Sequence, residues 1–379
     1  MKRIRLLIAV LSVGIGFGCK DLYKPDLVSS ATSYLVVEGV LNAGAGPTNI
    51  KLSRTYKLDD TARLRGEEFA TVTVEGKDNT TRQLTMAGAG LYTATSLNLT
   101  MGQEYRLRII TSNGKEYLSD YVTARQTPPI DSVGFHQNDK GVQLYVSTHD
   151  NTNSTRYYLW DFDETWELWT YYRSKFKYVN EVVLFRGPDD EVSTCWKYHS
   201  STDILLGSSA AFQSDIITEA PINFIPNGDE KPAIRYSILV RQYGLDKTGY
   251  EFYEMMKKNT ETLGTIFDAQ PSEIKGNIHS VSNPGELVIG YVSACTVEEK
   301  RIFIRSVDLN RWLFIQDCPP FQVTNQADSI RAAYSTGMSI YDAIYSMRNP
   351  GVIEAYKISY ARCVDCTVRG GSLGKPSYW

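Results

Sequence analysis

Residues 104–110 have the sequence EYRLRII, and this stretch decides the predicted fold class. In an extended strand, Tyr105, Leu107 and Ile109 lie on one face, and the charged residues between them lie on the other. The dipeptide Asn113-Gly114 follows, which favours the tight turn of a hairpin. The pattern therefore predicts antiparallel β-structure with one buried face and one solvated face.

The region around this strand contains further short strands separated by turn residues. We expect them at residues 34–41, 48–52, 71–75, 90–94 and 116–118. Roughly six or seven short strands with turns about every ten residues are typical of a small β-sandwich. Pro128 and Pro129 cannot continue a strand ladder, so the segment Thr127–Asp131 marks a boundary. We therefore predict an Ig-like β-sandwich over residues 33–128.

Residues 129–379 are predicted to form a larger, β-rich domain. Candidate strands lie at residues 142–146, 156–160, 182–185, 234–241, 287–294 and 301–307, and the last two are expected to form a hairpin or meander. One helix is expected from Asp246, its N-cap, to Gly264, because residues on one face recur in steps of three and four. A second, shorter helix is expected at Ser339–Met347. The predicted fold class is mainly β, with one or two helices.

Composition and charge exclude some functional classes. The chain has 379 residues, a formal net charge of −3 at pH 7 and no basic run, so we expect no nucleic-acid partner. Charged residues make up 22% and aromatic residues 12%, which indicates a globular protein rather than a disordered one. After residue 19 no stretch is long and apolar enough to span a bilayer, so we expect the rest of the chain to be soluble.

The amino terminus has the parts of a bacterial lipoprotein signal. Residues 1–5, MKRIR, are basic, and residues 6–17 are an uninterrupted apolar or small-residue run. A run of about a dozen residues suits a signal peptide and is short for a membrane span, which needs ~20. Gly16 and Gly18 then stand at −3 and −1 before Cys19. We expect residues 1–18 to be removed and Cys19 to carry the lipid that anchors the protein in the membrane.

Residues 19–32 are expected to form a lipidated tether. Lys20-Asp21 resembles the lysine-plus-acid signal that sends lipoproteins of Bacteroidota to the cell surface. Only one acid precedes Leu22, so the alternative is a solvated tether that carries no surface-export signal. The mature chain of 361 residues (379 − 18) is long enough for two or three domains. The predicted location is the outer membrane, by a lipid anchor, at the cell surface.

The mature chain holds five cysteines besides the one that carries the lipid. They are Cys195, Cys295, Cys318, Cys363 and Cys366. In an exported protein, disulfides are expected rather than free thiols. The pair Cys363 and Cys366 could also form a redox motif or half of a zinc site, but no βαβ pattern accompanies it and no histidine lies nearer than His279. We predict that Cys318 pairs with Cys363 or Cys366 and that at least one cysteine stays free.

The sequence contains none of the common catalytic, cofactor or metal-binding motifs. The four histidines are scattered without metal-ligand spacing. His149-Asp150 could orient a general base, although a loop is the favoured interpretation. Asp161 and Asp163 are close enough to suggest glycosidase carboxylates or calcium ligands, but a solvated strand end is favoured. We therefore predict no catalytic residue, no metal site and no cofactor.

The stretch from residue 157 to residue 178 is strongly aromatic and includes three tryptophans. Large amphipathic rings serve interfaces and sugar-binding platforms, but they also fill the cores of packed strand pairs. The sequence leaves these two interpretations open. Charged residues alternate with the rings from residue 164 onward, so we place a partner or ligand contact on a loop carrying Trp166, Trp169, Tyr171 and Tyr172.

Several longer segments resemble a known family. They are Cys195-Trp196, YSILVRQY at residues 236–243, residues 250–278 with EFYEMMKKNTETLGTIFDAQPSEIKGNI, GYVSA at residues 290–294 and CVDCTVRGGSLGKPSYW at residues 363–379. Together with the TPPIDS boundary, they resemble the Bacteroidota outer-membrane lipoproteins of domain of unknown function four-two-four-nine, across essentially the whole chain. Many members of that family carry a cysteine shortly after the GNI segment, where this chain has Ser280. That departure leaves the partner of Cys195 open, with Cys295 as the nearest substitute.

The resemblance implies a genomic context rather than a chemical activity. No functional residues are established for the family, so none can be assigned to this chain. Genes of this family lie beside those of TonB-dependent receptors, which implies an accessory lipoprotein that docks on such a transporter and helps to capture or admit its ligand. The alternative hypothesis is a surface hydrolase of glycans or peptides. A hydrolase predicts a cleft in which Asp161, Asp163 or His149 meets another titratable group with a perturbed pKa.

Overall fold

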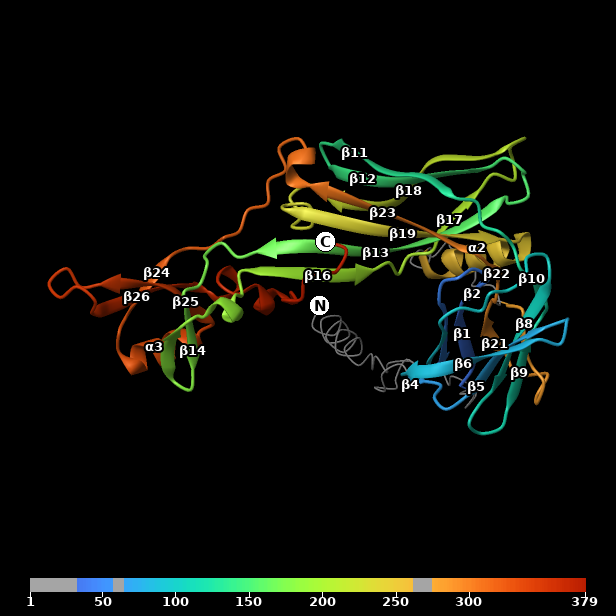
Figure 1. The fold of residues 1–379 in the computed structure, drawn as a ribbon, viewed down its shortest axis with the longest axis horizontal. Helices are drawn as coiled ribbons and strands as arrows, with labels where there is room; N and C mark the ends of the chain where they lie inside the picture. Colours follow the sequence, from blue (N-terminus) through green and yellow to red (C-terminus); the bar gives the residue numbers. More distant parts are fainter. Residues whose placement is uncertain (1–32, 57–64, 262–274) are drawn as a thin grey trace, which may run out of the picture. The chain divides into compact units, whose positions relative to one another are not determined.

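Strands dominate the structure, as the alternation of apolar and polar residues predicts (Figure 1). The computed structural model describes residues 33–56, 65–261 and 275–379. Within these ranges the fold is mainly β with two α-helices, so the predicted fold class is confirmed. Cys19 and the expected tether lie outside the described residues.

The first region consists of two sheets joined by a shared strand. Its strands are β1 (Leu35–Gly39), β2 (Leu41–Asn42), β3 (Thr48–Arg54), β4 (Arg65–Gly66), β5 (Thr71–Gly76), β6 (Thr81–Gly88), β7 (Leu91–Ala94), β8 (Glu104–Ile110), β9 (Glu116–Ser119) and β10 (Val122–Thr123). The first half of β6 pairs with β5 and the second half pairs with β7, so β6 passes from one sheet to the other. Tyr105, Leu107 and Ile109 enter the apolar core, as the opening motif predicts.

Three strands from much later in the chain complete these sheets. They are β20 (Ile278–Ser280), β21 (Val288–Gly290) and β22 (Ala294–Cys295). β20 pairs with β9, while β21 and β22 run parallel to β1 and β2. The first region therefore extends beyond residues 33–128. The expected hairpin between residues 287–294 and 301–307 is wrong, because parallel pairing with β1 involves no local turn that the sequence could reveal.

The second region contains two further sheets that enclose one core. The smaller sheet consists of β11 (Ile130–Asn138), β12 (Gly141–Asp150) and β18 (Asp215–Pro226). The larger sheet consists of β16 (Thr194–Ser200), β17 (Leu205–Ser208), β13 (Tyr157–Trp169), β19 (Arg235–Leu245) and β23 (Val297–Arg305). β13 pairs with β19 along one edge and with β16 and β17 along the other. Tyr158, Trp160 and Phe162 point from β13 into the core.

The C-terminal module is a third, smaller group of elements. It comprises β14 (Phe176–Val179), β15 (Val182–Phe185), β24 (Phe321–Thr324), α3 (Ala327–Ser335), β25 (Met338–Tyr345) and β26 (Ile353–Tyr360). They share one core cluster. Short 3₁₀ turns occur at Pro188–Asp190, Ser306–Asp308, Ala361–Cys363 and Cys366–Arg369.

The helix expected at Ser339–Met347 is wrong, because this segment forms strand β25. The register of β25 against β26 shifts between Ile340 and Asp342, and Ile340 and Tyr341 are both buried. A bulge of this kind breaks the strict alternation of a strand. With the alternation interrupted, the apolar residues of this segment recur at a spacing that resembles a helical period. This spacing explains why the sequence predicted a helix here.

Helix α2 (Lys247–Glu261) begins where the sequence predicts. The backbone N–H of Gly249 donates to Asp246 Oδ1 at 2.7 Å, so the Asp246 carboxylate acts as the N-cap. The Tyr291 hydroxyl donates to the same oxygen at 3.1 Å. The expected end at Gly264 lies outside the described residues.

No helix in the described ranges has the length and apolar character needed to cross a bilayer.

Replacing Asp246 with alanine is expected to lower the free energy of unfolding by about 1 kcal/mol, because the cap bond is lost. Asp246→Asn keeps an acceptor for the Gly249 N–H and is expected to lose less. Chemical denaturation of both variants measures the difference. Equal losses would contradict the capping role.

Candidate interaction surface

The two tryptophans near the end of β13 have opposite environments. Trp166 is 8% exposed and belongs to the core, and its Nε1 donates to Glu230 Oε1 at 3.1 Å. Trp169 is the last residue of β13 and is 53% exposed, with Nε1 donating to Glu167 Oε1 at 2.7 Å. Both tryptophans therefore lie on a strand rather than on the predicted loop. Only Trp169 is available at the surface.

The two tyrosines that follow divide in the same way. Tyr171 is exposed. Tyr172 is half-buried and stacks on Tyr341 with a centroid distance of 4.0 Å, and its hydroxyl donates to the carbonyl oxygen of Cys318 at 3.0 Å. Tyr172 therefore helps to hold the chain together, while Tyr171 faces outward. Of the four predicted contact residues, two are surface residues.

An extended segment at residues 312–318 runs beside Trp169. Its side chains alternate: Trp312 is buried, whereas Leu313 is 69% exposed and Ile315 is 84% exposed. Gln316 Nε2 donates to the carbonyl oxygen of Trp169 at 3.2 Å, which fixes the segment against the end of β13. The described part of the chain contains no strand that pairs with it. The sequence analysis did not single out this segment, although its apolar run at residues 312–315 was available as a signal.

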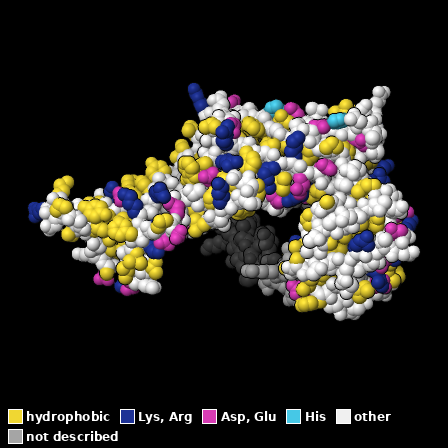
Figure 2. Space-filling model, in the orientation of Figure 1, with side chains coloured by type: hydrophobic (Ala, Val, Ile, Leu, Met, Phe, Trp, Pro, Cys, Tyr) yellow, Lys and Arg dark blue, Asp and Glu magenta, His cyan; other side chains and the backbone are white. Residues whose placement is uncertain are grey.

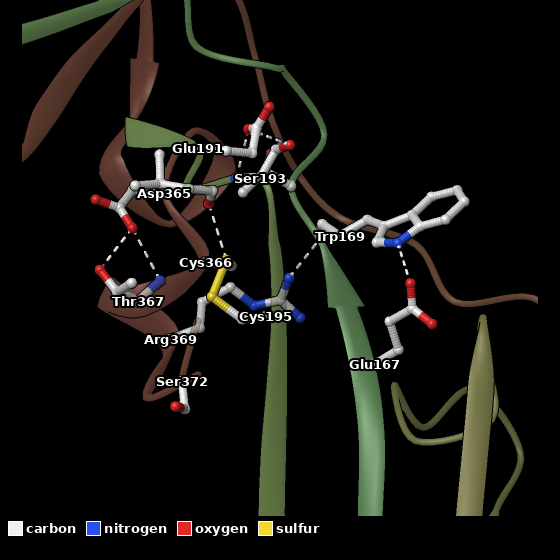
Figure 3. The surroundings of a disulfide bond; sticks show 12 residues. Glu167, Trp169, Glu191, Ser193, Cys195, Asp365, Cys366, Thr367, Arg369 and Ser372 are labelled. Atoms are coloured by element: carbon white, nitrogen blue, oxygen red, sulfur yellow. Dashed lines mark hydrogen bonds between the residues drawn. A yellow bond between two sulfur atoms is a disulfide. The ribbon is translucent and has the colours of Figure 1, made fainter. Parts of the chain in front are cut away.

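A second segment reaches the same carbonyl oxygen from the other side. Arg369 donates to this oxygen at 3.2 Å (Figure 3). Arg369 also forms an ion pair with Glu230. The neighbouring Val368 is 59% exposed. We use the term Trp169 surface for the exposed apolar residues gathered here, namely Trp169, Tyr171, Leu313, Ile315 and Val368.

Two disulfides fasten these segments. Cys318 is joined to Cys363, one of the two partners predicted for it, and Cys195 is joined to Cys366 (Figure 3). The suggested pairing of Cys195 with Cys295 is wrong, because Cys295 is a free, buried thiol on β22. The bond at Cys318 spans 45 residues, for which chain entropy predicts a stabilisation of about 4 kcal/mol.

Glu230 connects the core tryptophan to this surface. Besides Trp166 and Arg369, it accepts a hydrogen bond from Lys197 Nζ at 2.8 Å. Burial raises the pKa of Glu230, but the hydrogen bonds from Lys197, Trp166 and Arg369 outweigh that effect and hold its pKa below the ordinary value. The carboxylate is therefore ionised and fixes Arg369 beneath the Trp169 surface.

Asp161 and Asp163 are not at a solvated strand end, because β13 continues past them. Arg241 on β19 binds both: its Nη1 donates to Asp161 Oδ1 at 2.6 Å, and its Nη2 donates to Asp163. The Tyr243 hydroxyl donates to Asp161 Oδ2 at 2.7 Å, and burial together with Asp161 raises the pKa of Tyr243. One guanidinium thus compensates both carboxylates. A calcium site or a pair of glycosidase carboxylates would need oxygens directed at a ligand, whereas these oxygens are directed at Arg241.

His149 and Asp150 do not form a catalytic pair. His149 Nδ1 is 2.7 Å from Asp131 Oδ2, and this hydrogen bond raises the pKa of the exposed imidazole. The Asp150 carboxylate instead accepts backbone N–H bonds from Thr152 and Ser154 in the following turn. His149 and Asp150 both belong to strand β12 and pair with β18, so the favoured loop interpretation is wrong, and the turn begins only after Asp150.

A buried carboxylate that the sequence analysis did not single out lies at Glu164, whose side chain is 1% exposed. Oε1 accepts from Tyr236 at 2.7 Å and from Asn223 at 2.8 Å. Lys231 contacts both oxygens, and His199 Nδ1 lies 2.9 Å from Oε2. Because both oxygens are fully engaged, Glu164 stabilises the core and has no capacity left for a substrate. Its inward position on an alternating strand was the available signal.

Within the described ranges, no group of three or more histidine, cysteine or acidic residues is arranged to hold a metal ion. The fold and this surface define a disulfide-bonded, mainly β protein with an exposed apolar surface. A family model, Domain of unknown function (DUF4249), matches residues 20–301, so the chain belongs to that family. The match ends before the extended segment at 312–318 and before the CVDC tail. A search of curated proteins found no match.

Replacing Glu230 with glutamine is expected to lower the free energy of unfolding at pH 7 by about 1–3 kcal/mol, because a hydrogen-bonded charge is lost. The folded-state pKa of Glu230 is lowered, so its stabilising effect is present above the unfolded pKa of about 4.3 and is lost as pH falls through the folded value. The difference between wild type and variant should therefore shrink in acid. Denaturation at several pH values measures it, with exposed Glu354→Gln as control. A difference that does not change with pH would contradict this role.

Proposed function

We propose that this chain is a lipid-anchored outer-membrane protein that acts as a non-enzymatic accessory partner of a TonB-dependent transporter. It docks through the Trp169 surface and takes part in the capture or admission of the ligand. The observation that carries this proposal is the exposed apolar surface at the end of β13, fastened by two disulfides.

Composition and exposure support a protein contact at this surface. Its five apolar residues are each more than half exposed, and contiguous exposed apolar area in a soluble region marks interaction sites. Tryptophan and tyrosine are enriched among residues that dominate binding energy. Further apolar side chains gather over the C-terminal module, at the left of Figure 2, including Phe185, Phe321 and Met347.

Rigidity gives a second line of support. The carbonyl oxygen of Trp169 is held by both Gln316 and Arg369, and the two disulfides close the same segments. A surface that is ordered before binding loses less conformational entropy on association. These contacts therefore favour a docking role over an incidental exposure of apolar residues.

The alternative of a surface hydrolase has weaker support. Asp161 does meet Tyr243, whose pKa is raised, as that hypothesis requires. However, Arg241 lies between Asp161 and Asp163 and bonds to both. A glycosidase needs one of its two carboxyl groups to face the leaving group of the substrate and the other to face the sugar ring or a water molecule, whereas both of these carboxylates bind the same guanidinium.

The anchor is tested by replacing Cys19 with serine. The variant is expected to move from the outer-membrane fraction to the soluble fraction, because the acyl chains supply the membrane affinity. Immunoblotting of fractionated cells measures the change. A variant that stays with the membrane would refute the lipid anchor. Protease treatment of intact cells, with digestion expected, tests surface exposure separately.

The docking surface is tested by the double variant Trp169→Ala with Tyr171→Ala. We expect about thirtyfold weaker co-purification with the transporter, since truncating one hot-spot residue commonly costs about 2 kcal/mol. The melting temperature should stay unchanged, because both rings are exposed.

The matched control is Phe212→Ala with Ile216→Ala, two exposed apolar residues elsewhere in the second region. It should leave co-purification intact. Trp166→Ala serves as a second comparison, because it removes a core residue and should lower the melting temperature instead. Normal co-purification of the Trp169/Tyr171 variant would exclude this surface as the contact.

A further inference from the structure

Two adjoining cavities are lined by residues of β1, α2 and the larger sheet of the second region. These elements lie next to one another in Figure 1. One has a volume of about 730 Å³ and is lined by β13, β19 and the segment at residues 39–49. The other has a volume of about 500 Å³ and is lined by β1, β21 and α2. Gly39 and Tyr253 border both cavities. We refer to the pair as the cleft.

The wall of the cleft is built from closely paired backbone. Gly39 and Gly290 both have positive φ angles, of 138° and 148°. A Cβ atom at Gly39 would lie 2.3 Å from the carbonyl oxygen of Asn49, and one at Gly290 would lie 2.3 Å from that of Val37. No side chain fits at either position, so backbone lines the wall there. The cleft is therefore a preformed feature of paired strands.

The lining of the cleft is acidic. Its charged residues in the described chain are Glu38, Asp161, Asp203, Glu299 and Arg241, which is four acids and one base. Arg241 already forms ion pairs with Asp161, Asp163 and Glu299. At the smaller cavity, Glu38 has only Lys51 at 3.8 Å, and Asp203 has no ion-pair or hydrogen-bond partner among the described residues. Both residues are exposed, so a cation that enters the cavity can reach their carboxylates, at Glu38 in competition with Lys51.

The same cavity offers an apolar surface and an unused hydroxyl. Phe252, Met256 and Tyr291 line it beside Tyr253. Burial raises the pKa of Tyr253, so its hydroxyl stays protonated at neutral pH. Within the described ranges this hydroxyl has no hydrogen-bond partner. Tyrosine faces also attract cations through their electron-rich rings.

We propose that the cleft binds an organic cation, namely an ammonium group carried on an apolar chain or ring. The ammonium is held by the Glu38 and Asp203 carboxylates, and the apolar body packs against Phe252, Met256 and Tyr291. This chemistry belongs equally to a free amine and to the lysine side chain of a peptide. The inference does not depend on docking to a transporter, because the cleft is lined by none of the residues of the Trp169 surface.

Titration calorimetry on the purified mature protein, produced without its lipid, tests the proposal. The probes are phenethylamine, its uncharged analogue phenethyl alcohol, and the capped peptide acetyl-Phe-Lys-Phe-amide. We expect saturable binding of at least one cationic probe and none of the alcohol. A cationic free amine that binds alone points to a small amine, whereas binding of the peptide alone points to a peptide ligand.

The variant Glu38→Gln with Asp203→Asn should weaken binding about tenfold or more, because charge-assisted bonds are lost. The control Asp139→Asn changes an exposed acid in the turn after β11 and should bind as wild type does. Tyr253→Phe should show a smaller loss. Failure of both cationic probes to bind at millimolar concentration would overturn the proposal. So would equal binding of the alcohol, or full binding by the double variant.

Discussion

The structure depends on the pairing of strand β13 along both of its edges. Thirteen consecutive residues stay extended because β19 bonds to one edge and β16 and β17 bond to the other. Strict alternation then assigns each side chain to one face. Tyr158, Trp160 and Phe162 fill the core on one side. Asp161 and Asp163 lie on the opposite face and bind Arg241. Trp169, the last residue of the strand, is exposed at the surface.

Charges on the two faces of β13 are compensated in different ways. Glu164 lies in the core and is satisfied by Lys231, His199, Tyr236 and Asn223, which is the condition for burying a carboxylate. Asp161 and Asp163 share a single guanidinium on the facing strand. Both arrangements use acids to fix neighbouring elements. Glu38 and Asp203 are exposed acids that border a cavity instead.

Local patterns explain what the sequence could predict. Alternation identified strands such as β8, and an acidic cap followed by helical spacing identified the start of α2. Errors arose where distant residues decide the outcome. β21 joins β1 in parallel, and the bulge in β25 imitates a helical period. The sequence interpretation left the aromatic stretch undivided between core and surface. Trp166 lies on the core face of β13 with its Nε1 bonded to Glu230, whereas Trp169 is exposed at the end of the strand.

The Trp169 surface depends on the oxidation of two cysteine pairs as well as on folding. The sheets that enclose the main core hold together through strand pairing and apolar packing. The segments around Cys318 and Cys366, in contrast, have few ladder bonds of their own. In a reducing compartment the chain would therefore keep its sheets, but the segments around Cys318 and Cys366 would no longer be held in place beside Trp169. The compartment in which the four cysteines are oxidised thus determines when the Trp169 surface, our proposed docking site, takes its final form.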